Sequence, residues 1–183
     1  ISRCITMDDS DRIWIGTREG LSLYNHYKDE FSNYYYKRNG LNVAVTSIIP
    51  IKKDWLMLGT AEGILLFDVK KECFLSDTLS SSLHGLQPAA LVRQGDCIYI
   101  GTEEGVYIYT LSNGILEKLV DVPTGIRVHA ILCQMFNRIW LATEGDGLYL
   151  YDMKTKELKN YRYEDGKSGL NSNYVRSLAL DTE

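Results

Sequence analysis

The sequence predicts an all-β protein built from four copies of one four-stranded repeat. Three observations support this fold class: one motif returns at regular spacing, the apolar residues alternate in short runs bounded by glycine turns, and no segment shows a sustained helical period. The 183 residues include 13 Tyr against 4 Phe, and amphipathic rings of this kind suit a half-buried pleated surface.

The repeated motif consists of an apolar strand ending in Gly-Thr, a turn closed by Gly, and a second apolar strand. It occupies residues 13–24, 56–67, 98–109 and 139–151, and the last copy has one extra residue in its turn. The copies lie about 42–43 residues apart, which is within the range of β-propeller blades. Each copy is followed by an apolar residue and by a Gly-apolar pair, at Phe31, Phe74, Leu116 and Leu158 and at Gly40, Gly85, Gly125 and Gly169.

Each repeat accounts for four antiparallel strands. The innermost begins where a small residue precedes an aliphatic one, as at 45–49, because small side chains fit where blades crowd together. The Gly-Thr strand comes second, and its glycine permits close approach of a neighbouring backbone. A tight glycine turn leads to the third strand. The fourth, around 31–36, is more polar, as expected for an outer edge.

The four repeats fill the chain, so we expect residues 1–183 to form a single segment of four blades that starts and ends on an inner strand, the last at 175–180. The opening residues carry no initiator Met or signal peptide, and we interpret the chain as a segment of something longer. No kinase or transmembrane segment is expected in it. Four unclosed blades expose apolar ends, which predicts either a larger propeller or self-association, for example of two copies into eight blades.

Charge and cysteine content argue against several functions. The net charge is −4 and the basic residues are scattered, so no nucleic-acid partner is expected. The apolar runs are too short to cross a membrane. The cysteines have no C-x-x-C spacing, and we expect unpaired, mostly buried thiols at Cys4, Cys73, Cys97 and Cys133.

No catalytic or metal constellation emerges from the sequence. The histidines His26, His84 and His129 occupy non-equivalent repeat positions, and no Ser has a nucleophile-elbow context. Residues 8–11 invite a calcium interpretation but lack the glycine and distal glutamate of an EF-hand loop, so turn chemistry explains them better. We expect no enzyme activity, no cofactor and no metal.

Binding is more plausible, because propellers bind ligands on the face built by two sets of loops. One set leads into each inner strand; the other joins the second and third strands at 18–19, 62, 103–104 and 144–146. Arg and Asn there could hydrogen-bond sugar hydroxyls or pair with a uronic carboxylate. The aromatic run 34–36 places at least one ring outward, while the others could cover the adjacent blade. The ligand-binding candidates are Arg18, Glu19, Tyr35, Asn42, His84, Arg127, His129, Asn171 and Asn173.

The motif Trp14-Ile15-Gly16-Thr17, with Gly20-Leu21 and Tyr24, resembles the two-component-regulator propeller repeat. The segment 169–178 matches it best, whereas Met57 and Tyr99 replace the Trp and Ala142 replaces the Gly. The resemblance implies the extracytoplasmic sensor half of a hybrid two-component regulator of the kind common in Bacteroides. It also implies a periplasmic location and oligosaccharide ligands.

The repeat itself leaves other functions open. A protein-interaction scaffold of the WD-repeat kind is the main alternative, and a propeller-fold carbohydrate-active enzyme is less favoured because no group of carboxylates or His, Tyr and Arg can be assembled at the loop face. Specificity is expected where the blades differ, namely near Asp146 and in the loops after Gly85 and Gly125.

Overall fold

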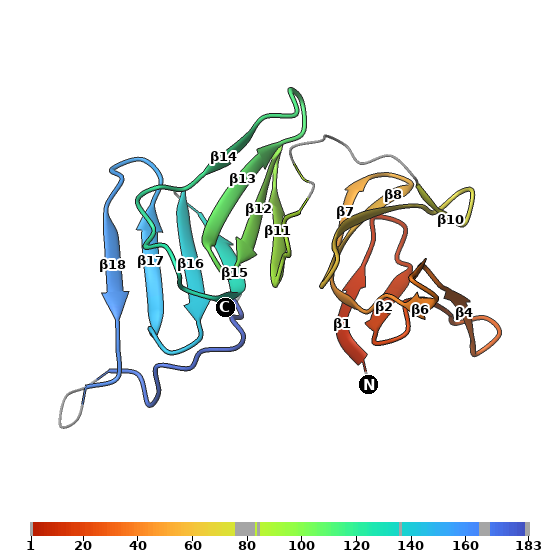
Figure 1. The fold of residues 1–183 in the computed structure, drawn as a ribbon, viewed down its shortest axis with the longest axis horizontal. Helices are drawn as coiled ribbons and strands as arrows, with labels where there is room; N and C mark the ends of the chain where they lie inside the picture. Colours follow the sequence, from red (N-terminus) through yellow and green to blue (C-terminus); the bar gives the residue numbers. More distant parts are fainter. Residues whose placement is uncertain (1, 76–82, 84, 136, 165–168, 182–183) are drawn as a thin grey trace. The chain divides into compact units, whose positions relative to one another are not determined.

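The computed structural model describes residues 2–75, 83, 85–135, 137–164 and 169–181, and these form four four-stranded antiparallel sheets (Figure 1). The first sheet contains β1 (Ser2–Met7), β2 (Ile13–Thr17), β3 (Leu21–Asn25) and β4 (Glu30–Tyr34). The second contains β7 (Val45–Lys52), β8 (Trp55–Thr60), β9 (Gly63–Asp68) and β10 (Cys73–Leu75). The third contains β11 (Ala90–Gln94), β12 (Cys97–Thr102), β13 (Gly105–Thr110) and β14 (Leu116–Lys118). The fourth contains β15 (Val128–Gln134), β16 (Arg138–Thr143), β17 (Leu148–Asp152) and β18 (Leu158–Tyr161).

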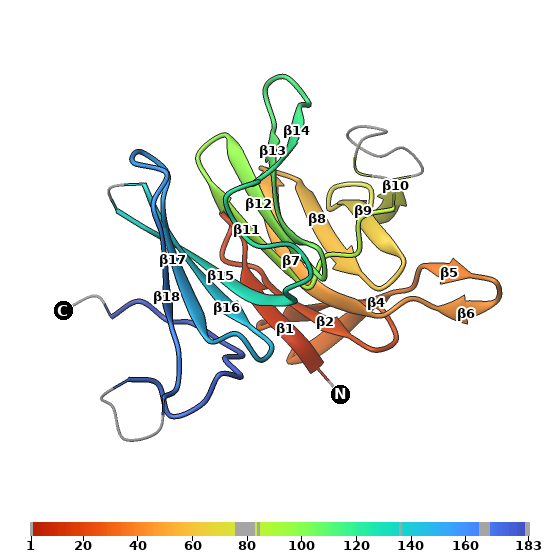
Figure 2. The same ribbon diagram turned by 60° about the vertical axis from the view of Figure 1, so that its left-hand side comes forward.

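Every strand of a sheet pairs with the next strand along the chain, so the all-β fold of four four-stranded repeats is confirmed. The connection after β4 adds a feature that the sequence did not reveal, a short hairpin of β5 (Lys37–Arg38) and β6 (Leu41–Asn42) (Figure 2). Its turn contains Asn39 and Gly40, which both have positive φ. Residues of this kind favour tight hairpin turns because they tolerate left-handed backbone.

The inner strand expected at 175–180 is not formed in the structure. Only its beginning is held, by a bridge between Glu144 and Tyr174 and by a hydrogen bond from the amide of Val175 to the carbonyl of Thr143. In each of the four sheets the inner strand pairs with the Gly-Thr strand that follows it. Among the described residues no following strand is paired with 175–180, and an inner strand needs such a partner for its backbone groups.

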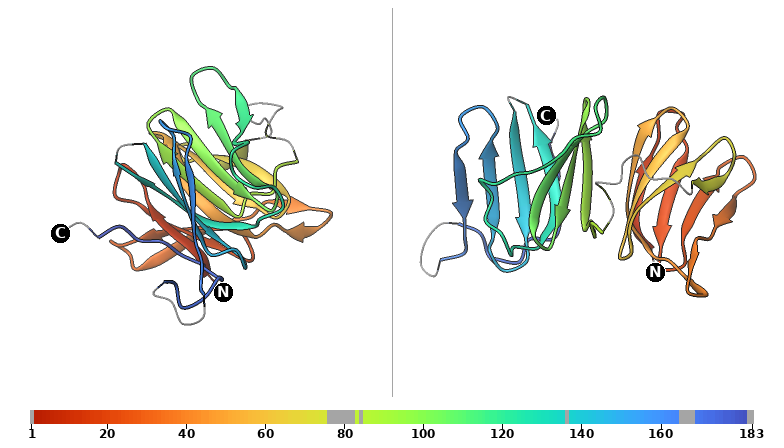
Figure 3. Two further views of the ribbon diagram at one scale, coloured as in Figure 1. Left: turned by 90° about the vertical axis from the view of Figure 1, so that its left-hand side faces the viewer. Right: turned by 45° about the horizontal axis from the view of Figure 1, so that its top comes forward.

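The chain divides into two compact units, Ile1–Pro88 and Ala89–Glu183, and each contains two sheets. In the first unit β1 and β2 lie beside β7 (Figure 3), and a buried cluster that includes Trp14, Leu58 and Phe67 joins the two sheets. In the second unit β11 and β12 lie beside β15, and the cluster includes Tyr99, Leu141 and Tyr151. The aromatic that replaces Trp in the third repeat therefore occupies the same buried place.

The three tyrosines at the end of β4 have different surroundings. Tyr34 packs against Trp14 and Phe67, with ring centroids 6.2 and 4.8 Å away, and Tyr36 packs against Phe74 at 5.4 Å. Tyr35 is 55% exposed. The strand β4 ends at Tyr34, whereas the sequence predicted an outer strand around 31–36, so the aromatic run continues past the end of the observed strand.

The glycine of the Gly-Thr strand lies against the neighbouring inner strand, as predicted. A Cβ on Gly16 would overlap the Cys4 sulfur and lie 2.8 Å from the carbonyl oxygen of Val45. The equivalent Cβ on Gly101 would lie 3.2 Å from the carbonyl oxygen of Val128. Backbones of adjacent sheets approach closely here because no side chain separates them.

The threonine of the same strand holds the turn that follows. The hydroxyl of Thr60 donates a hydrogen bond to the carbonyl of Gly63 (2.7 Å) and accepts one from the amide of Glu62 (3.1 Å). Thr17 and Thr102 make the same pair of hydrogen bonds in their own turns. The repeated Thr is therefore a turn-forming residue, because one hydroxyl serves both a donor and an acceptor of the backbone.

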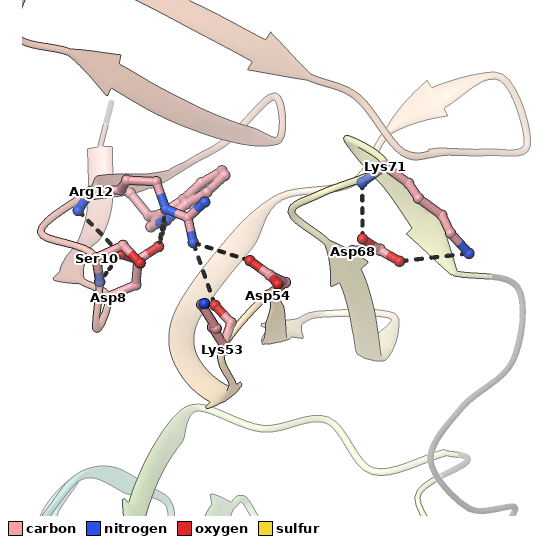
Figure 4. Close-up of polar contacts among 8 residues, drawn as sticks. Asp8, Ser10, Arg12, Lys53, Asp54, Asp68 and Lys71 are labelled. Atoms are coloured by element: carbon pink, nitrogen blue, oxygen red, sulfur yellow. Dashed lines mark hydrogen bonds and ion pairs between the residues drawn. The ribbon is translucent and has the colours of Figure 1, made fainter.

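Residues 8–11 form the turn that the sequence indicated, and they are organised around Asp8 (Figure 4). Its carboxylate accepts hydrogen bonds from the Trp14 indole (2.8 Å), from Arg12 Nε (2.7 Å) and from the amide of Ser10 (2.9 Å). Burial by itself raises the pKa of Asp8, but these hydrogen bonds outweigh it and lower the pKa below its ordinary value. Arg12 also reaches the Lys53 carbonyl and Asp54, so the turn ties the first sheet to the second.

All four cysteines are free and all lie in strands. Cys4, Cys97 and Cys133 are only partly buried and Cys73 is exposed on β10, which corrects the expectation of mostly buried thiols. Cys73 is exposed because β10 is the outer strand of its sheet. Burial raises the pKa of Cys4 and of Cys133 to about 11.

Candidate functional site

The two sets of loops predicted to bind ligands meet at one edge of the second unit. Val128, the first residue of β15, pairs with Thr143, the last residue of β16. The connection that ends at Arg127 therefore lies next to the turn that begins at Glu144. The strand register thus brings together loops that are separated in the sequence by a complete hairpin.

Four side chains from these loops contact one another, and we call them the Arg127 cluster: Glu103, Arg127, His129 and Glu144. The terminal nitrogens of Arg127 lie 3.3 Å from Glu103 Oε1 and 3.5 Å from Glu144 Oε2. The Nε2 atom of His129 lies 3.2 Å from the same Glu144 oxygen. The arginine thus links the turns of the third and fourth repeats.

The cluster is open to solvent, since its side chains are between 28% and 63% exposed. Exposed ion pairs of this kind contribute about 0–1 kcal/mol each to stability. The ion pairs of the cluster therefore contribute little to the stability of the fold. The polar atoms of the cluster remain accessible to a ligand.

The extra residue in the fourth turn organises the segment beside the cluster. The amides of Gly145 and Gly147 both donate to the carbonyl of Asn173, at 3.0 and 2.8 Å. The side-chain oxygen of Asn173 accepts a hydrogen bond from the amide of Tyr163 (2.7 Å). Tyr174 follows directly, and its 66% exposed side chain lies over Gly145. An ion pair of 2.8 Å between Arg162 and Asp146 closes the same turn.

The first unit brings together a smaller set of candidates. The side-chain amide of Asn42 donates to Glu19 (2.8 Å), and the Asn42 Oδ1 atom is buried without a partner among the described residues. Arg18 and Tyr35 are exposed at the same connection and turn. Arg38 of the unpredicted hairpin lies 3.3 Å from Glu62.

The nine candidate residues therefore have different surroundings. Arg127 and His129 share one cluster, Glu19 and Asn42 form a pair, and Asn173 serves the backbone of a turn. Asn171 is exposed, and His84 lies outside the described residues. Glu103 and Glu144 belong to the loops predicted to bind ligand, but neither they nor Tyr174 were among the nine candidates. The extra residue of the fourth turn, at 145–146, was the signal in the sequence that could have pointed to Tyr174, because Tyr174 lies over this turn.

Among the described residues, no group of three or more His, Cys, Asp and Glu side chains is placed to hold a metal ion. No helix in the described part of the chain is long and apolar enough to span a membrane.

The sheets define a chain of the β-propeller class, and comparison with solved structures agrees with this. No model of a protein family matches the chain, and no curated protein matches it. The extracellular domain of the putative one-component system BT4673 from B. thetaiotaomicron matches with a TM-score of 0.81 and 23% identity, over 100% of this chain and 25% of that chain.

Two further structures have the same fold. The extracellular domain of the putative hybrid two-component system BT3049 from B. thetaiotaomicron matches with a TM-score of 0.77 and 16% identity, over 98% of this chain and 24% of that chain. PorZ, a surface component of the type-IX secretion system of Porphyromonas gingivalis, matches with a TM-score of 0.69 and 19% identity, over 98% of this chain and 29% of that chain. The chain spans about a quarter of the length of these proteins. At these identities the likeness shows a shared fold, the one found in these extracellular domains.

Proposed function

We propose that the chain is a ligand-binding segment of the extracytoplasmic, periplasmic sensor half of a hybrid two-component signalling protein, and that its ligand is an oligosaccharide. The observation that carries the proposal is the match of the entire chain to the extracellular domain of BT4673, with a TM-score of 0.81. The segment has no catalytic role in this proposal.

The Arg127 cluster supplies the chemistry for a sugar ligand. The arginine and His129 can donate hydrogen bonds to hydroxyl oxygens, while Glu144 can accept from hydroxyl groups. The exposed ring of Tyr174 offers a flat surface for the apolar face of a sugar ring. Polar groups beside one aromatic surface are typical of sites that orient a small ligand.

Signalling requires that the ligand bind one conformation better than another. A ligand that contacts Glu103 and Glu144 together bridges the turns of two repeats, so it favours the arrangement in which both turns are in reach. The resulting shift in population is the signal passed to the remainder of the sensor.

Isothermal titration calorimetry of the 183-residue chain against oligosaccharides released from plant and host glycans tests the proposal. We expect at least one oligosaccharide to bind, and Tyr174→Ala to weaken it about tenfold or more, as for loss of a stacked ring and its buried area. Tyr27→Ala serves as the control because Tyr27 is exposed in the β3–β4 turn of the other unit. Absence of binding across the panel contradicts the proposal, and turnover of a sugar assigns the chain to the enzymes instead.

A second candidate function, an interaction surface, rests on the open face of the first sheet. Ile5, Met7 and Phe31 on this face are 68%, 61% and 58% exposed. Register places them on one face, because Met7 pairs with Ile13, Ile13 with Tyr24 and Tyr24 with Phe31. The equivalent face of the second sheet, with Leu58, Phe67 and Phe74, packs against the first sheet. We propose that another blade of the same repeat type covers the open face, supplied by a larger propeller or by a second copy.

A further inference from the structure

We infer that the Arg127 cluster selects a neutral, hydroxyl-rich glycan and rejects anionic glycans such as uronates and sulfated sugars. The inference rests on the proposed function and specifies the class of ligand. It decides between the two uses of arginine that the sequence left open, hydrogen bonding to hydroxyls and pairing with a uronic carboxylate.

Arg127 is already paired with carboxylates of the protein. A carboxylate or sulfate engages arginine best through two parallel N–H donors of the guanidinium. Both terminal nitrogens of Arg127 face protein carboxylates, one toward Glu103 at 3.3 Å and one toward Glu144 at 3.5 Å. An anionic ligand would have to displace at least one of these carboxylates, whereas a hydroxyl oxygen needs only a single remaining N–H.

The charged groups around Arg127 also disfavour an anionic ligand. The cluster holds two carboxylates, Glu103 and Glu144, against one guanidinium, and the imidazole of His129 lies beside Glu144. The neighbouring pair of Arg162 and Asp146, 2.8 Å apart, cancels internally. The negative excess produces a potential that disfavours a further anion and leaves a neutral ligand unaffected.

The site also offers a hydrogen-bond acceptor, Glu144 Oε1, near the aromatic ring of Tyr174. Within the described part of the chain, Glu144 uses Oε2 for both Arg127 and His129, which leaves Oε1 to accept hydrogen bonds from hydroxyl groups. The backbone bridge between Glu144 and Tyr174 places these two residues opposite each other, and the Tyr174 ring lies over the adjacent Gly145. Hydroxyl groups around an apolar ring face are the features that a neutral sugar presents to such a pair.

The cluster occurs in the second unit and its equivalent is absent from the first. The turn positions of Glu103 and Glu144 are taken there by Arg18 and Ala61, and Ala44 takes the position of Arg127, because Val45 pairs with Thr60 as Val128 pairs with Thr143. The repeat alone therefore does not produce this arrangement, and the expected binding stoichiometry is one glycan for each chain.

Calorimetry with two sets of tetrasaccharides tests the inference. The neutral set is gluco-, manno-, galacto- and xylotetraose; the anionic set is tetragalacturonate and tetrasaccharides of heparin and of chondroitin sulfate. We expect the wild-type chain to bind at least one neutral probe, with every anionic probe about tenfold weaker or more. Binding of the neutral probe should persist up to about 0.5 M salt, because screening acts on charge pairs and not on a neutral ligand.

The decisive variant is the double substitution Glu103→Gln with Glu144→Gln. It removes both negative charges and frees the Arg127 guanidinium, so we expect about tenfold loss of the neutral probe together with a gain in affinity for tetragalacturonate. Glu104→Gln is the matched control, because it changes one charge in the adjacent turn position outside the cluster. Melting temperatures and circular dichroism establish that each variant is folded, and Arg127→Gln provides a second variant at the same site.

Each result has a distinct meaning. Preferential binding of an anionic probe by the wild-type chain overturns the inference and leaves the proposed oligosaccharide function standing. Neutral binding that survives both the double substitution and Arg127→Gln overturns the assignment to the Arg127 cluster. Failure of every probe to bind contradicts the proposed function itself, together with the inference.

Discussion

At the scale of single residues, Asp8 connects the turn chemistry of the first repeat to its core. Its carboxylate is almost fully buried, and it accepts hydrogen bonds from the indole of Trp14 and from the amide and side chain of Arg12. Trp14 is itself fully buried between the first two sheets. A charged acceptor with several donors stabilises the fold only while it is ionised.

We therefore expect Asp8→Asn to lower the free energy of unfolding at pH 7 by about 1–3 kcal/mol, as for loss of hydrogen bonds to a charged group. The folded-state pKa of Asp8 lies below the unfolded value of about 3.9, so its contribution is present above that value and is lost as the pH falls through the folded pKa. Urea unfolding at pH 7 and below pH 4 measures the difference. An equal deficit at both values, or the same effect from the exposed Asp9→Asn, would contradict it.

Gly16 has no room for a side chain, because Cys4 and Val45 lie directly against it. We expect Gly16→Ala to destabilise the chain by about 1–3 kcal/mol, since the added Cβ overlaps the Cys4 sulfur and lies 2.8 Å from the Val45 carbonyl oxygen. Combining it with Cys4→Ala removes the sulfur and should restore part of the loss, while the clash with Val45 remains. Thermal unfolding of the two single variants and the double variant gives the coupling, and simple additivity would show that the two sites do not contact.

At the scale of elements, the turn between the second and third strands is the most regular part of the repeat. The hydroxyls of Thr17, Thr60 and Thr102 make the same two hydrogen bonds, and that of Thr143 donates to Gly147 across a turn with one more residue. The fourth turn is one residue longer, and the hydrogen bond from the Thr143 hydroxyl to the Gly147 carbonyl still closes it. The enlarged turn then has free amides for the carbonyl of Asn173.

Thr60→Val should lower the free energy of unfolding by about 1–3 kcal/mol, because valine keeps the shape but leaves the Gly63 carbonyl and the Glu62 amide without their partner. Thr155→Val is the control, since Thr155 is exposed and its hydroxyl makes only a 3.4 Å contact with Glu157. Chemical denaturation of both variants compares them. Equal stability of the two variants would show that the hydroxyl of Thr60 does not stabilise its turn.

At the scale of the whole molecule, the open face of the first sheet dominates the behaviour expected in solution. An exposed apolar face is costly to leave in water, and in a repeat protein it is normally covered by the next repeat. In the second sheet the equivalent face is covered by Trp14 of the first sheet. In the first sheet no described residue of the first unit covers Ile5, Met7 and Phe31 in this way.

We expect the 183-residue chain to associate as its concentration rises, and the double variant Ile5→Lys with Met7→Lys to remain at 20.9 kDa in light scattering. Lysine places charge on the face without touching the buried cluster on the other side of the sheet. Tyr27→Lys, on an 89% exposed residue of a turn, should leave association unchanged. A wild-type chain that stays at 20.9 kDa over the whole range would contradict self-association and leave only a larger propeller to cover the face.

Much of the fold could be predicted because the signals are local and repeated. Alternation and glycine turns mark the strands, and four copies of one motif at spacings close to 42 residues exclude chance. The segment 175–180 was predicted wrongly for the same reason: it has the local pattern of an inner strand, but a strand needs a partner for its backbone, and pairing is not a local property. The hairpin of β5 and β6 escaped notice because its strands are only two residues long.

The candidate site could be predicted only residue by residue. Arg127 and His129 were identified from loop position and side-chain type, yet nothing local indicates that Arg127 lies between Glu103 and Glu144, each in the turn of a different repeat.

By itself, the sequence determined the repeat, its strands and the loops that carry polar side chains, because hydrophobic alternation and turn chemistry act within a few residues. The tertiary structure alone decided which of those polar side chains meet. Packing of one sheet on the next brings the turns of separate repeats to a common edge, and there Arg127 is paired by two carboxylates instead of being left for an anionic ligand.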